Sequence, residues 1–486
     1  MANPLVLKVK MHGPMSGHAN GQLSFEGDSL FLEHEDGQKV TAMHWHPLPS
    51  LYILFVAYDQ SHKVVVDCLL PKETSKNLKQ KSFIFDPLDH DAAKSWAEAM
   101  NAEVYKGIKK SKHLKVIINP FSGTGKAKKI YESQVRPIFE KAQCTFDAIY
   151  TEQRNHARDL AKSLDLSTFD AIVVISGDGI VHEVVNGLLT RDDGKHLDIP
   201  LGVIPGGSGN ALSICLLGET KGLSPSHAAL NVIKGKPLKA DVCSVQQGDT
   251  RYFSFLSQSF GIIADLDIGT EHLRWMGDTR FTYGSLKCIM QGRRYPCELA
   301  VKLSEKDLSV IKEQYRNSYN NNESSTNENN NSTTENDISD TNNHVYGSIV
   351  DVYGSINDPV PDDWSVFTDD ICLFYAGKAP WMSKGALFFP CALPADGNVD
   401  MCIGWKDKLT KFQSIEVLGK IDKGTHIDTK MIDYYKVKAY RVTPKSQEGI
   451  ISIDGEKVPF SPFQVEVHEK LVNFLSVDGK YVPSGV

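Results

Sequence analysis

Three glycine-rich turns carry the residue types that could do chemistry in this chain. They are NPFSGTGK at 119–126, SGDG at 176–179 and PGGSGN at 205–210. Glycine lets the backbone approach an anion closely, and a helix that begins directly after the turn adds its positive end. A single turn of this kind is more often a steric solution to joining a strand to a helix. Three together, each with a polar side chain, predict a phosphate-binding site.

One residue within the turns, Asp178, differs in kind from its neighbours. Gly177 and Gly179 flank it, and an aspartate in such a setting is often a turn former. In a phosphate cleft its carboxylate would repel the ligand unless it accepted a proton from an attacking hydroxyl or held Mg²⁺. From the residues alone we expect one of these two roles, and both belong to phosphoryl transfer.

The segments around the turns alternate between apolar strands and amphipathic helices. Strands are expected at 114–118, 146–150, 171–176 and 201–204, and helices are expected to begin near residues 126, 155, 180 and 210. This alternation predicts βαβ units and a mainly parallel sheet, in an α/β catalytic domain over 112–238. The three turns then lie at the carboxyl edge of the sheet, where ligands bind in open α/β folds.

Three better-known nucleotide motifs do not fit the turns. A Walker A loop needs glycine where Pro120 stands and Ser or Thr where Ala127 stands. A Rossmann fingerprint needs glycine at the position of His182. The H-R-D-x-x-x-x-N and D-F-G motifs of protein kinases are absent from the sequence.

The regions on either side of the catalytic domain predict two further β structures. Over 1–108, short apolar strands are followed by a helical pattern at 90–106 that contains Trp96, which resembles a pleckstrin-homology domain with a structural or protein-binding role. From residue 239 onward, short alternating strands predict a mostly antiparallel, β-rich lipid-binding domain over 239–304 and 363–486. Its strands are expected at 240–245, 252–256, 297–303, 371–375, 401–405, 436–441, 450–453 and 464–468.

Residues 305–362 are expected to form a disordered insertion. The tract 314–343 is rich in Asn, Ser, Thr and Glu and has almost no apolar residue, so it cannot bury enough surface to order itself. It is followed by the repeat VYGSI at 345–349 and 352–356. The sequence does not choose between docking and phosphorylation as the role of this repeat.

The net charge, the cysteine spacing and the length of the apolar runs restrict the class of protein to which the chain can belong. The chain has 486 residues and a formal net charge of −7, which argues against nucleic-acid binding because that needs a positive footprint. Its nine cysteines form no CxxC pair and are expected to be reduced core residues. Residues 1–10 lack a signal-peptide pattern, and the longest apolar run, 51–58, is too short to span a bilayer. We expect a cytoplasmic protein that associates peripherally with intracellular membranes.

Six motifs give the chain a family likeness. They are NPFSGTGKA at 119–127, TEQRNHA at 151–157, SGDGIVHEVVNGL at 176–188, PGGSGNAL at 205–212, GIIADLDIGTEHLRWMGDTRF at 261–281 and IDGEKV at 453–458. Together they closely resemble the sphingosine kinases, within the diacylglycerol-kinase catalytic superfamily. The resemblance implies a two-domain kinase that uses ATP and Mg²⁺ and binds ATP between the α/β and β-rich domains. It implies a sphingoid long-chain base as the acceptor lipid, and a homodimer is left open.

The resemblance also implies roles for individual residues. Asp178 matches the general base, Ser176, Gly177 and Gly179 lie beside the acceptor, and Asp267 matches the residue that receives the lipid's amino group. The positions that match nucleotide contacts are Asn119, Pro120, Phe121, Thr151, Glu152, Gln153, Arg154, Glu183, Gly207, Ser208, Gly209, Arg274, Arg280, Asp454, Gly455 and Glu456. The metal ligands stay unassigned.

The residues themselves leave alternatives to several of these roles. Asp454 and Gly455 also fit a plain β-turn, and His182 is expected to be structural. The segment 261–267 is interpreted as an apolar strand end with two acids, where a carboxylate is costly unless it meets a cation such as a protonated amine. Asp267 could instead pair with Arg274 or His272. The tail pocket is expected to draw on Phe260, Ile262, Ile263, Leu266 and Phe281. A ceramide or diacylglycerol kinase, or a non-catalytic lipid-binding scaffold, are the alternative functions.

Overall fold

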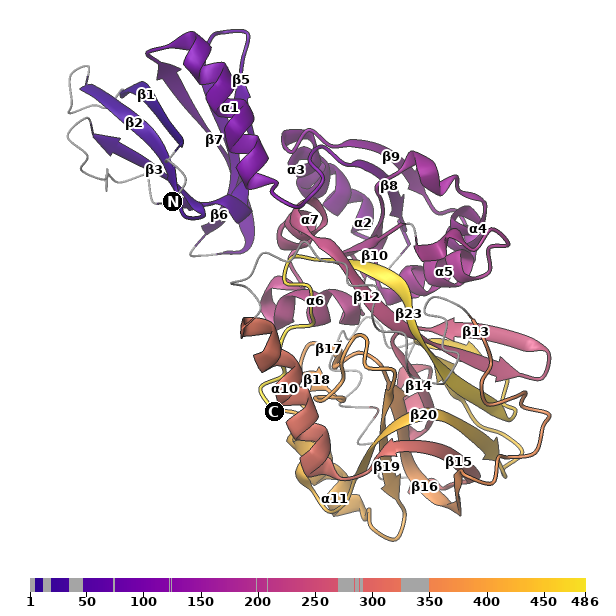
Figure 1. Cartoon of the computed structure of the whole chain (residues 1–486). Helices are drawn as coiled ribbons and strands as arrows, with labels where there is room; N and C mark the ends of the chain where they lie inside the picture. The colour runs from indigo at the N-terminus through magenta and orange to yellow at the C-terminus, as the bar shows by residue number, and fades with distance from the viewer. Residues whose placement is uncertain are drawn as a thin grey trace, which may run out of the picture.

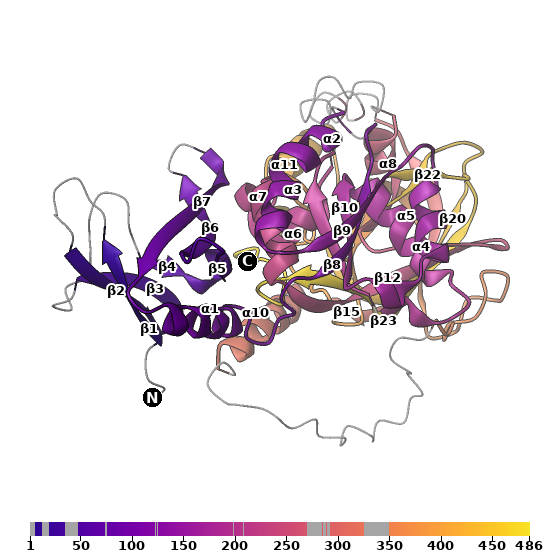
Figure 2. The same cartoon turned by 90° about the horizontal axis from the view of Figure 1, so that it is seen from above.

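The computed structural model comprises an N-terminal β sheet with one helix, an α/β part and a C-terminal β-rich part (Figure 1 and, turned by 90°, Figure 2). It describes residues 5–11, 19–34, 47–72, 75–121, 123, 125–197, 199–207, 209–269, 284, 288, 292–324 and 349–486. Ser208, Arg274, Arg280 and Phe281 lie outside this part, and so does the side chain of Asp267.

The N-terminal sheet is antiparallel, with strand order β4-β3-β2-β1-β7-β6-β5. Its elements are β1 (Leu5–Met11), β2 (Ala19–Glu26), β3 (Ser29–His34), β4 (Leu48–Pro49), η1 (Ser50–Tyr52), β5 (Ile53–Tyr58), β6 (Val64–Lys72), β7 (Ser75–Pro87) and α1 (His90–Val104). Asp89 caps α1 by accepting from the amides of Asp91 and Ala92, and Trp96 and Met100 bury the inner face of the helix. The strands and the closing helix agree with the sequence, and the pleckstrin-homology likeness stays a prediction.

The N-terminal sheet is packed against the α/β part. One hydrophobic cluster contains side chains of both, among them Leu54 of β5 and Ile138 and Val232 of the helices α3 and α7. Polar contacts cross the same boundary, since the amide of Leu78 donates to Ser226 Oγ over 2.7 Å. The first and second parts therefore share a core.

The α/β part confirms the predicted strands and helices around the glycine turns. Its strands are parallel, in the order β9-β8-β10-β11. The strands are β8 (His113–Ile118), β9 (Thr145–Tyr150), β10 (Ala171–Ser176) and β11 (Leu201–Pro205). The helices are α2 (Ala127–Ile130), η2 (Tyr131–Val135), α3 (Arg136–Lys141), α4 (His156–Ser163), η3 (Leu166–Thr168), α5 (Asp178–Leu189), η4 (Lys195–Leu197), α6 (Ala211–Lys221) and α7 (Pro225–Lys234).

The C-terminal part is antiparallel and continues the same sheet. The long strand β23 pairs with β12 and β20, and at Phe474 it also meets Leu201 of β11, which joins the two parts into one 14-stranded sheet. Its strands are β12 (Lys236–Gln247), β13 (Thr250–Ser254), β14 (Ser257–Gly261), β15 (Tyr295–Glu305), β16 (Ser365–Gly377), β17 (Trp381–Ser383), β18 (Ala386–Leu387), β19 (Val399–Trp405), β20 (Asp433–Pro444), β21 (Ile451–Ile453), β22 (Glu456–Val458) and β23 (Phe463–Ser476). Its helices are α8 (Ile262–Asp267), α10 (Leu308–Ser324), α11 (Lys411–Leu418) and η7 (Thr425–Asp428).

Two expectations from the sequence are wrong in this part, the first of them in the described stretches of 305–362. There, α10 is a helix whose Ile311 and Tyr315 are buried, and residues 351–358 are held against β12, β20 and β23, whereas residues 325–348 lie outside the described part. Arg441, for example, donates to the carbonyls of Ser355 and Asp358. The segment 262–267 is not a strand end but the helix α8, because Gly261, at φ +84°, turns the chain out of β14.

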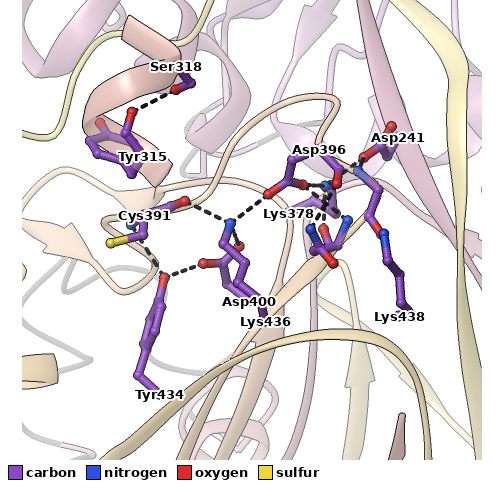
Figure 3. A network of polar contacts seen from close by, with 12 residues as sticks. Asp241, Tyr315, Ser318, Lys378, Cys391, Asp396, Asp400, Tyr434, Lys436 and Lys438 are labelled. Carbon is purple, nitrogen blue, oxygen red and sulfur yellow. Dashed lines mark hydrogen bonds and ion pairs between the residues drawn. The ribbon is translucent and has the colours of Figure 1, made fainter. Parts of the chain in front are cut away.

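A buried network of charges holds the loop between β18 and β19 against the sheet (Figure 3). Lys378 Nζ donates to Asp241 and Asp396 over 2.9 Å each, and Lys436 Nζ donates to Asp396 and Asp400 over 2.7 and 2.8 Å. Burial raises the pKa of Asp400. Although burial opposes it, the charges of Asp241 and Asp396 raise the pKa of Lys378. Each buried charge thus has an opposite partner, as such groups require.

Candidate active site

Asp178 lies where β10 ends and α5 begins, and its carboxylate faces the start of a second helix. Oδ2 accepts from the amide of Ala211 over 2.8 Å and Oδ1 from that of Leu212 over 3.2 Å, at the N-terminus of α6. A Cβ atom on Gly209 would lie 3.3 Å from Oδ2, so the third turn closes tightly over this side chain. The second and third glycine turns therefore meet at Asp178.

The half-buried position of Asp178 changes its acidity. Burial raises the pKa of this carboxyl to about 6, even though the two amides of α6 favour the charged form, and the charge of Asp454 adds to the rise. A carboxylate with this pKa is ionised at neutral pH and is a stronger base than an exposed aspartate. These are the properties that a general base needs.

The first turn reaches the same edge of the sheet. The amide of Asn119 donates to the carbonyl of Ile175 over 3.3 Å, and that of Gly206 donates to Ser176 over 3.0 Å. Gly123 and Gly125 have φ angles of +55° and +70°, which side chains with a Cβ rarely adopt. All three turns thus gather at the carboxyl ends of β8, β10 and β11.

Glu183 makes contacts within the protein. Its two carboxylate oxygens accept from the amides of Asn155 and Ala157 over 3.0 and 3.1 Å. These amides open α4, so Glu183 on α5 supplies the cap that α4 otherwise lacks. Glu183 therefore fixes the segment 151–157, in which four of the predicted nucleotide contacts lie.

The β21–β22 hairpin brings the C-terminal part to the helix α5. Asp454 and Gly455 turn with φ angles of +50° and +83°, as the sequence pair suggests. The Asp454 carboxylate is completely buried and lies 2.9 Å from His182 Nδ1. It also accepts from Ser254 Oγ over 2.5 Å and from the amides of Phe255, Leu256 and Ser257 over 3.1, 3.0 and 2.9 Å. Asp454 thus ties α5 to the turn between β13 and β14.

Glu456, at the end of the same hairpin turn, borders the site. Its carboxylate pairs with Arg154 over 2.6 Å, and a Cβ atom on Gly179 would lie 3.5 Å from its Oε1. Both charged side chains are well exposed, at 73% for Arg154 and 40% for Glu456. The pair forms a polar rim beside Asp178 that links segments 302 residues apart.

Of the two acids of α8, the structure describes the side chain of Asp265 but not that of Asp267. Asp265 is buried, and its Oδ2 accepts from Tyr295 OH over 2.7 Å and from Arg293 over 2.9 Å. Asp267 ends the helix. From the sequence, Asp267 is the expected functional acid. The pairing of Asp265 is not readable there, because its partners come about 30 residues later. The predicted tail residues also divide, because Ile263 and Leu266 pack with Tyr375 and Phe389, whereas Phe260 belongs to the core of the sheet.

Two kinds of feature, a metal-binding cluster and a membrane-spanning helix, are absent from the described ranges. No three His, Cys, Asp or Glu side chains gather there as a metal site. Within the same ranges no helix has both the length and the apolar content to cross a bilayer.

Comparisons with known proteins agree with this geometry. Residues 113–245 match the family model "Diacylglycerol kinase catalytic domain". The solved structure of a putative diacylglycerol kinase from Bacillus anthracis superposes with a TM-score of 0.52 at 17% identity, covering 78% of this chain and 99% of that one, so the two share the fold.

Curated relatives match over most of their length. Sphingoid long chain base kinase 5 of Saccharomyces cerevisiae is 36% identical over 90% of this chain and 68% of the relative. Sphingoid long chain base kinase 4 of Schizosaccharomyces pombe is 34% identical over 76% of each chain. Sphingosine kinase 1 of Arabidopsis thaliana is 31% identical over 78% of this chain and 74% of the relative. With its catalytic motifs gathered at one sheet edge and this similarity along most of its length, the chain belongs to the sphingoid long chain base kinase family.

Proposed function

We propose that this protein transfers the γ-phosphate of ATP to the primary hydroxyl of a sphingoid long-chain base, with Asp178 as the general base. The observation that carries the proposal is the position of Asp178, half-buried where the glycine turns meet, with a pKa of about 6. The hydroxyl oxygen attacks the γ-phosphorus and its proton passes to Asp178. The bond from the γ-phosphorus to the bridging oxygen breaks, and ADP leaves.

The nucleotide is proposed to lie along the carboxyl edge of the parallel sheet. The turns 119–126 and 205–210 offer backbone amides and close approach to the phosphates. We infer that Pro120, Phe121, Gly207 and the segment Thr151–Arg154 contact the nucleotide there, beside the Arg154–Glu456 pair. Asp454 is proposed to act indirectly, because its carboxylate is completely buried. Glu183 is proposed to act through the segment 151–157, because it caps the helix α4.

Mg²⁺ fits this arrangement as a companion of the nucleotide. In the part of the chain that the structure describes, no cluster of three potential ligands would cage a metal ion. Mg²⁺ is commonly held by substrate phosphates with one or two carboxylates, and when bound it neutralises phosphate charge. We propose that Mg²⁺ is held mainly by the nucleotide phosphates, and its protein ligands stay unassigned.

The amine of the lipid is proposed to meet Asp267. Asp265, two residues earlier, already pairs with Arg293, which leaves the last acid of α8 as the candidate. Peripheral membrane contact, a cytoplasmic location and a homodimer stay predictions from the sequence.

Transfer of labelled phosphate from ATP tests the proposal. Sphinganine should be phosphorylated, and its N-acylated form should react far more slowly because it lacks the cation. Asp178→Asn should lower kcat by about 10²-fold or more, the usual contribution of a general base. Asp192→Asn, an exposed acid in the same domain, is the matched control. Equal rates for the two lipids would favour a ceramide or diacylglycerol kinase, and full activity of Asp178→Asn would remove the general base.

A further inference from the structure

The helix α11 is a preformed element at the surface of the C-terminal part (Figure 1). Thr410 and Gln413 form a capping box, in which the amide of Gln413 donates to Thr410 Oγ1 over 3.4 Å and the amide of Thr410 donates to Gln413 Oε1 over 2.8 Å. Such a box satisfies the first amides of the helix and fixes where it begins. Side chains on α11 are therefore presented in a defined orientation.

The outer face of α11 carries two exposed apolar side chains. Phe412 is 87% exposed, more than any other large apolar side chain in the described ranges, and Ile415 is 45% exposed. Residues three apart lie on the same side of a helix, so the two form one apolar spot. A phenyl ring is more stable buried than exposed to water, which points to a partner that covers it.

Basic side chains surround the start of this helix. Lys408 and Lys411 precede Phe412, and a Cβ atom on Gly292 would lie 3.4 Å from Lys411 Cε, which places Arg293 beside this end. Arg294 lies 3.5 Å from Asp370, whose carbonyl accepts from the amide of Lys406. These five cations lie at the start of α11 or along the chain that leads into it. Three of them pair with Asp265, Asp370 and Asp433, and the exposed acids Asp407 and Glu416, the latter on α11 and paired with Lys420, offset the positive charge further.

The inner face of α11 leads toward the proposed lipid site. Val417 is buried in an apolar cluster with Leu409, Ile427 and Leu266. Leu266 belongs to α8, the helix that ends at Asp267. One short helix thus separates an exposed apolar spot from the apolar cluster next to the candidate amine ligand.

We propose that the outer face of α11 docks on a lipid bilayer that contains anionic lipids, with Phe412 and Ile415 entering the interface and the surrounding lysines and arginines near the head groups. An apolar face flanked by cations is the pattern of interfacial helices. A protein partner needs about 800 Å² of complementary surface on each side, which two side chains on a two-turn helix do not provide. The link to substrate delivery rests on the proposed function, but the docking itself does not.

Sedimentation of the full chain with vesicles tests the docking. Wild-type protein should bind vesicles of phosphatidylcholine with phosphatidylserine more strongly than vesicles of phosphatidylcholine alone. Phe412→Ser should reduce binding by about tenfold or more, the size expected for loss of one buried phenyl group. Ile84→Ser is the matched control, because Ile84 is 62% exposed on β7 of the N-terminal sheet. Absence of vesicle binding by the wild type, or equal effects of the two substitutions, would overturn the proposal.

A kinase assay separates this proposal from the proposed function. With sphinganine in vesicles, Phe412→Ser should raise KM, whereas with sphinganine in detergent micelles its kcat and KM should match those of the wild type. An inactive protein whose vesicle binding still depends on Phe412 would keep the docking surface and refute the kinase function. An active kinase whose KM on vesicles is unchanged by Phe412→Ser would keep the kinase function and refute the docking surface.

Discussion

Two features of the surroundings of Asp178 act in opposite directions on the ionisation of its carboxyl group. Burial disfavours the carboxylate, and the amides of Ala211 and Leu212 stabilise it. The result is a group that is charged at neutral pH but takes up a proton near pH 6. The balance between burial and hydrogen bonding should therefore be visible in how kcat depends on pH.

We therefore predict an acidic limb in the pH dependence of kcat. The carboxylate must be ionised to accept the proton of the hydroxyl, so the rate should rise with pH through about 6 and fall about tenfold per unit below it. Initial rates across this range at saturating ATP measure the limb. Nucleotide binding, followed separately, should change little over the same range, and a flat rate profile would contradict the assignment.

Asp454 is predicted to act through structure more than through contact with ATP. Asp454→Ala would leave the buried amides of Phe255, Leu256 and Ser257 without an acceptor, at about 1–3 kcal/mol each, although nearby groups would compensate in part. Urea unfolding should show a loss of at least about 2 kcal/mol. If Asp454 served only the nucleotide, stability would be unchanged and KM for ATP would rise.

The sequence placed Asp178 among the three turns correctly, yet it could not place the partners of Glu183, Asp265 or Asp454. Asp454 meets Ser254 across 200 residues, and Asp265 meets Tyr295 across 30. Such contacts depend on how strands return to one another, and no local pattern encodes them. Motif positions are readable from one chain, whereas the atoms that each side chain binds are not.

At the scale of elements, close packing of α4 on α5 sets the position of the catalytic helix. A Cβ atom on Gly187 would lie 2.3 Å from the carbonyl of Arg158 and 2.8 Å from Ala161 Cβ. Gly187 is thus required because the two helices touch there. The start of α4, which Glu183 caps, is held by the same contact region.

Gly187→Ala should therefore push α4 away from α5 and lower the stability by about 1–3 kcal/mol, as overpacking does. A fall in Tm measures the effect, and KM for ATP should rise because the segment 151–157 moves. Gly419→Ala is the control, since its φ is −69° and a Cβ atom there would lie 3.6 Å from its nearest neighbour. If the two variants lost equal stability, contact between α4 and α5 would not explain the effect.

The strands of the α/β part follow from their sequence because each is a mainly apolar run between turn residues, interrupted in β8 and β9 only by Lys115 and Asp147, which pair with each other. The sequence of α8 predicts a strand end as readily as a helix, because a short run with three consecutive apolar residues fits both. In contrast, α10 had a readable signal, since Leu308, Ile311 and Tyr315 recur at helical spacing. The polar tract that follows them hid this pattern.

At the scale of the whole molecule, two buried lysines lie where the N-terminal sheet meets the α/β part. Lys234 Nζ donates to the carbonyl of Val104 over 3.1 Å and lies 3.9 Å above the ring of Tyr105. Lys112 Nζ donates to the carbonyls of Val232 and Gly235. Burial lowers the pKa of Lys234 to about 7, with the charge of Lys112 adding, and lowers that of Lys112 to about 8.

The stability of the whole chain should consequently rise with pH above about 7. Up to about pH 8 the unfolded chain keeps both lysines protonated while the folded chain releases protons, so the free energy of unfolding increases. At higher pH the buried thiols oppose the rise, because burial raises the pKa of Cys68, Cys144 and Cys243 in the folded chain while the unfolded chain loses those protons at about pH 8.5. Denaturant unfolding at several pH values measures the slope. Lys234→Met should flatten it, whereas Lys94→Met, at an exposed lysine on α1, should leave it unchanged. A slope between about pH 7 and pH 8 that is the same for the wild type and for Lys234→Met would contradict the prediction.

The buried network of Lys378, Lys436 and three aspartates also bears on how this sequence can change over generations. Loss of either lysine leaves an aspartate, Asp241 or Asp400, without an ion-pair partner in the interior, at a cost of about 3–5 kcal/mol. That is a large share of the stability of most proteins. Selection should remove single substitutions there, while joint replacement of an acid and a lysine by apolar residues would be tolerated. These positions should therefore be inherited as a block, and where lineages diverge, they should diverge in pairs.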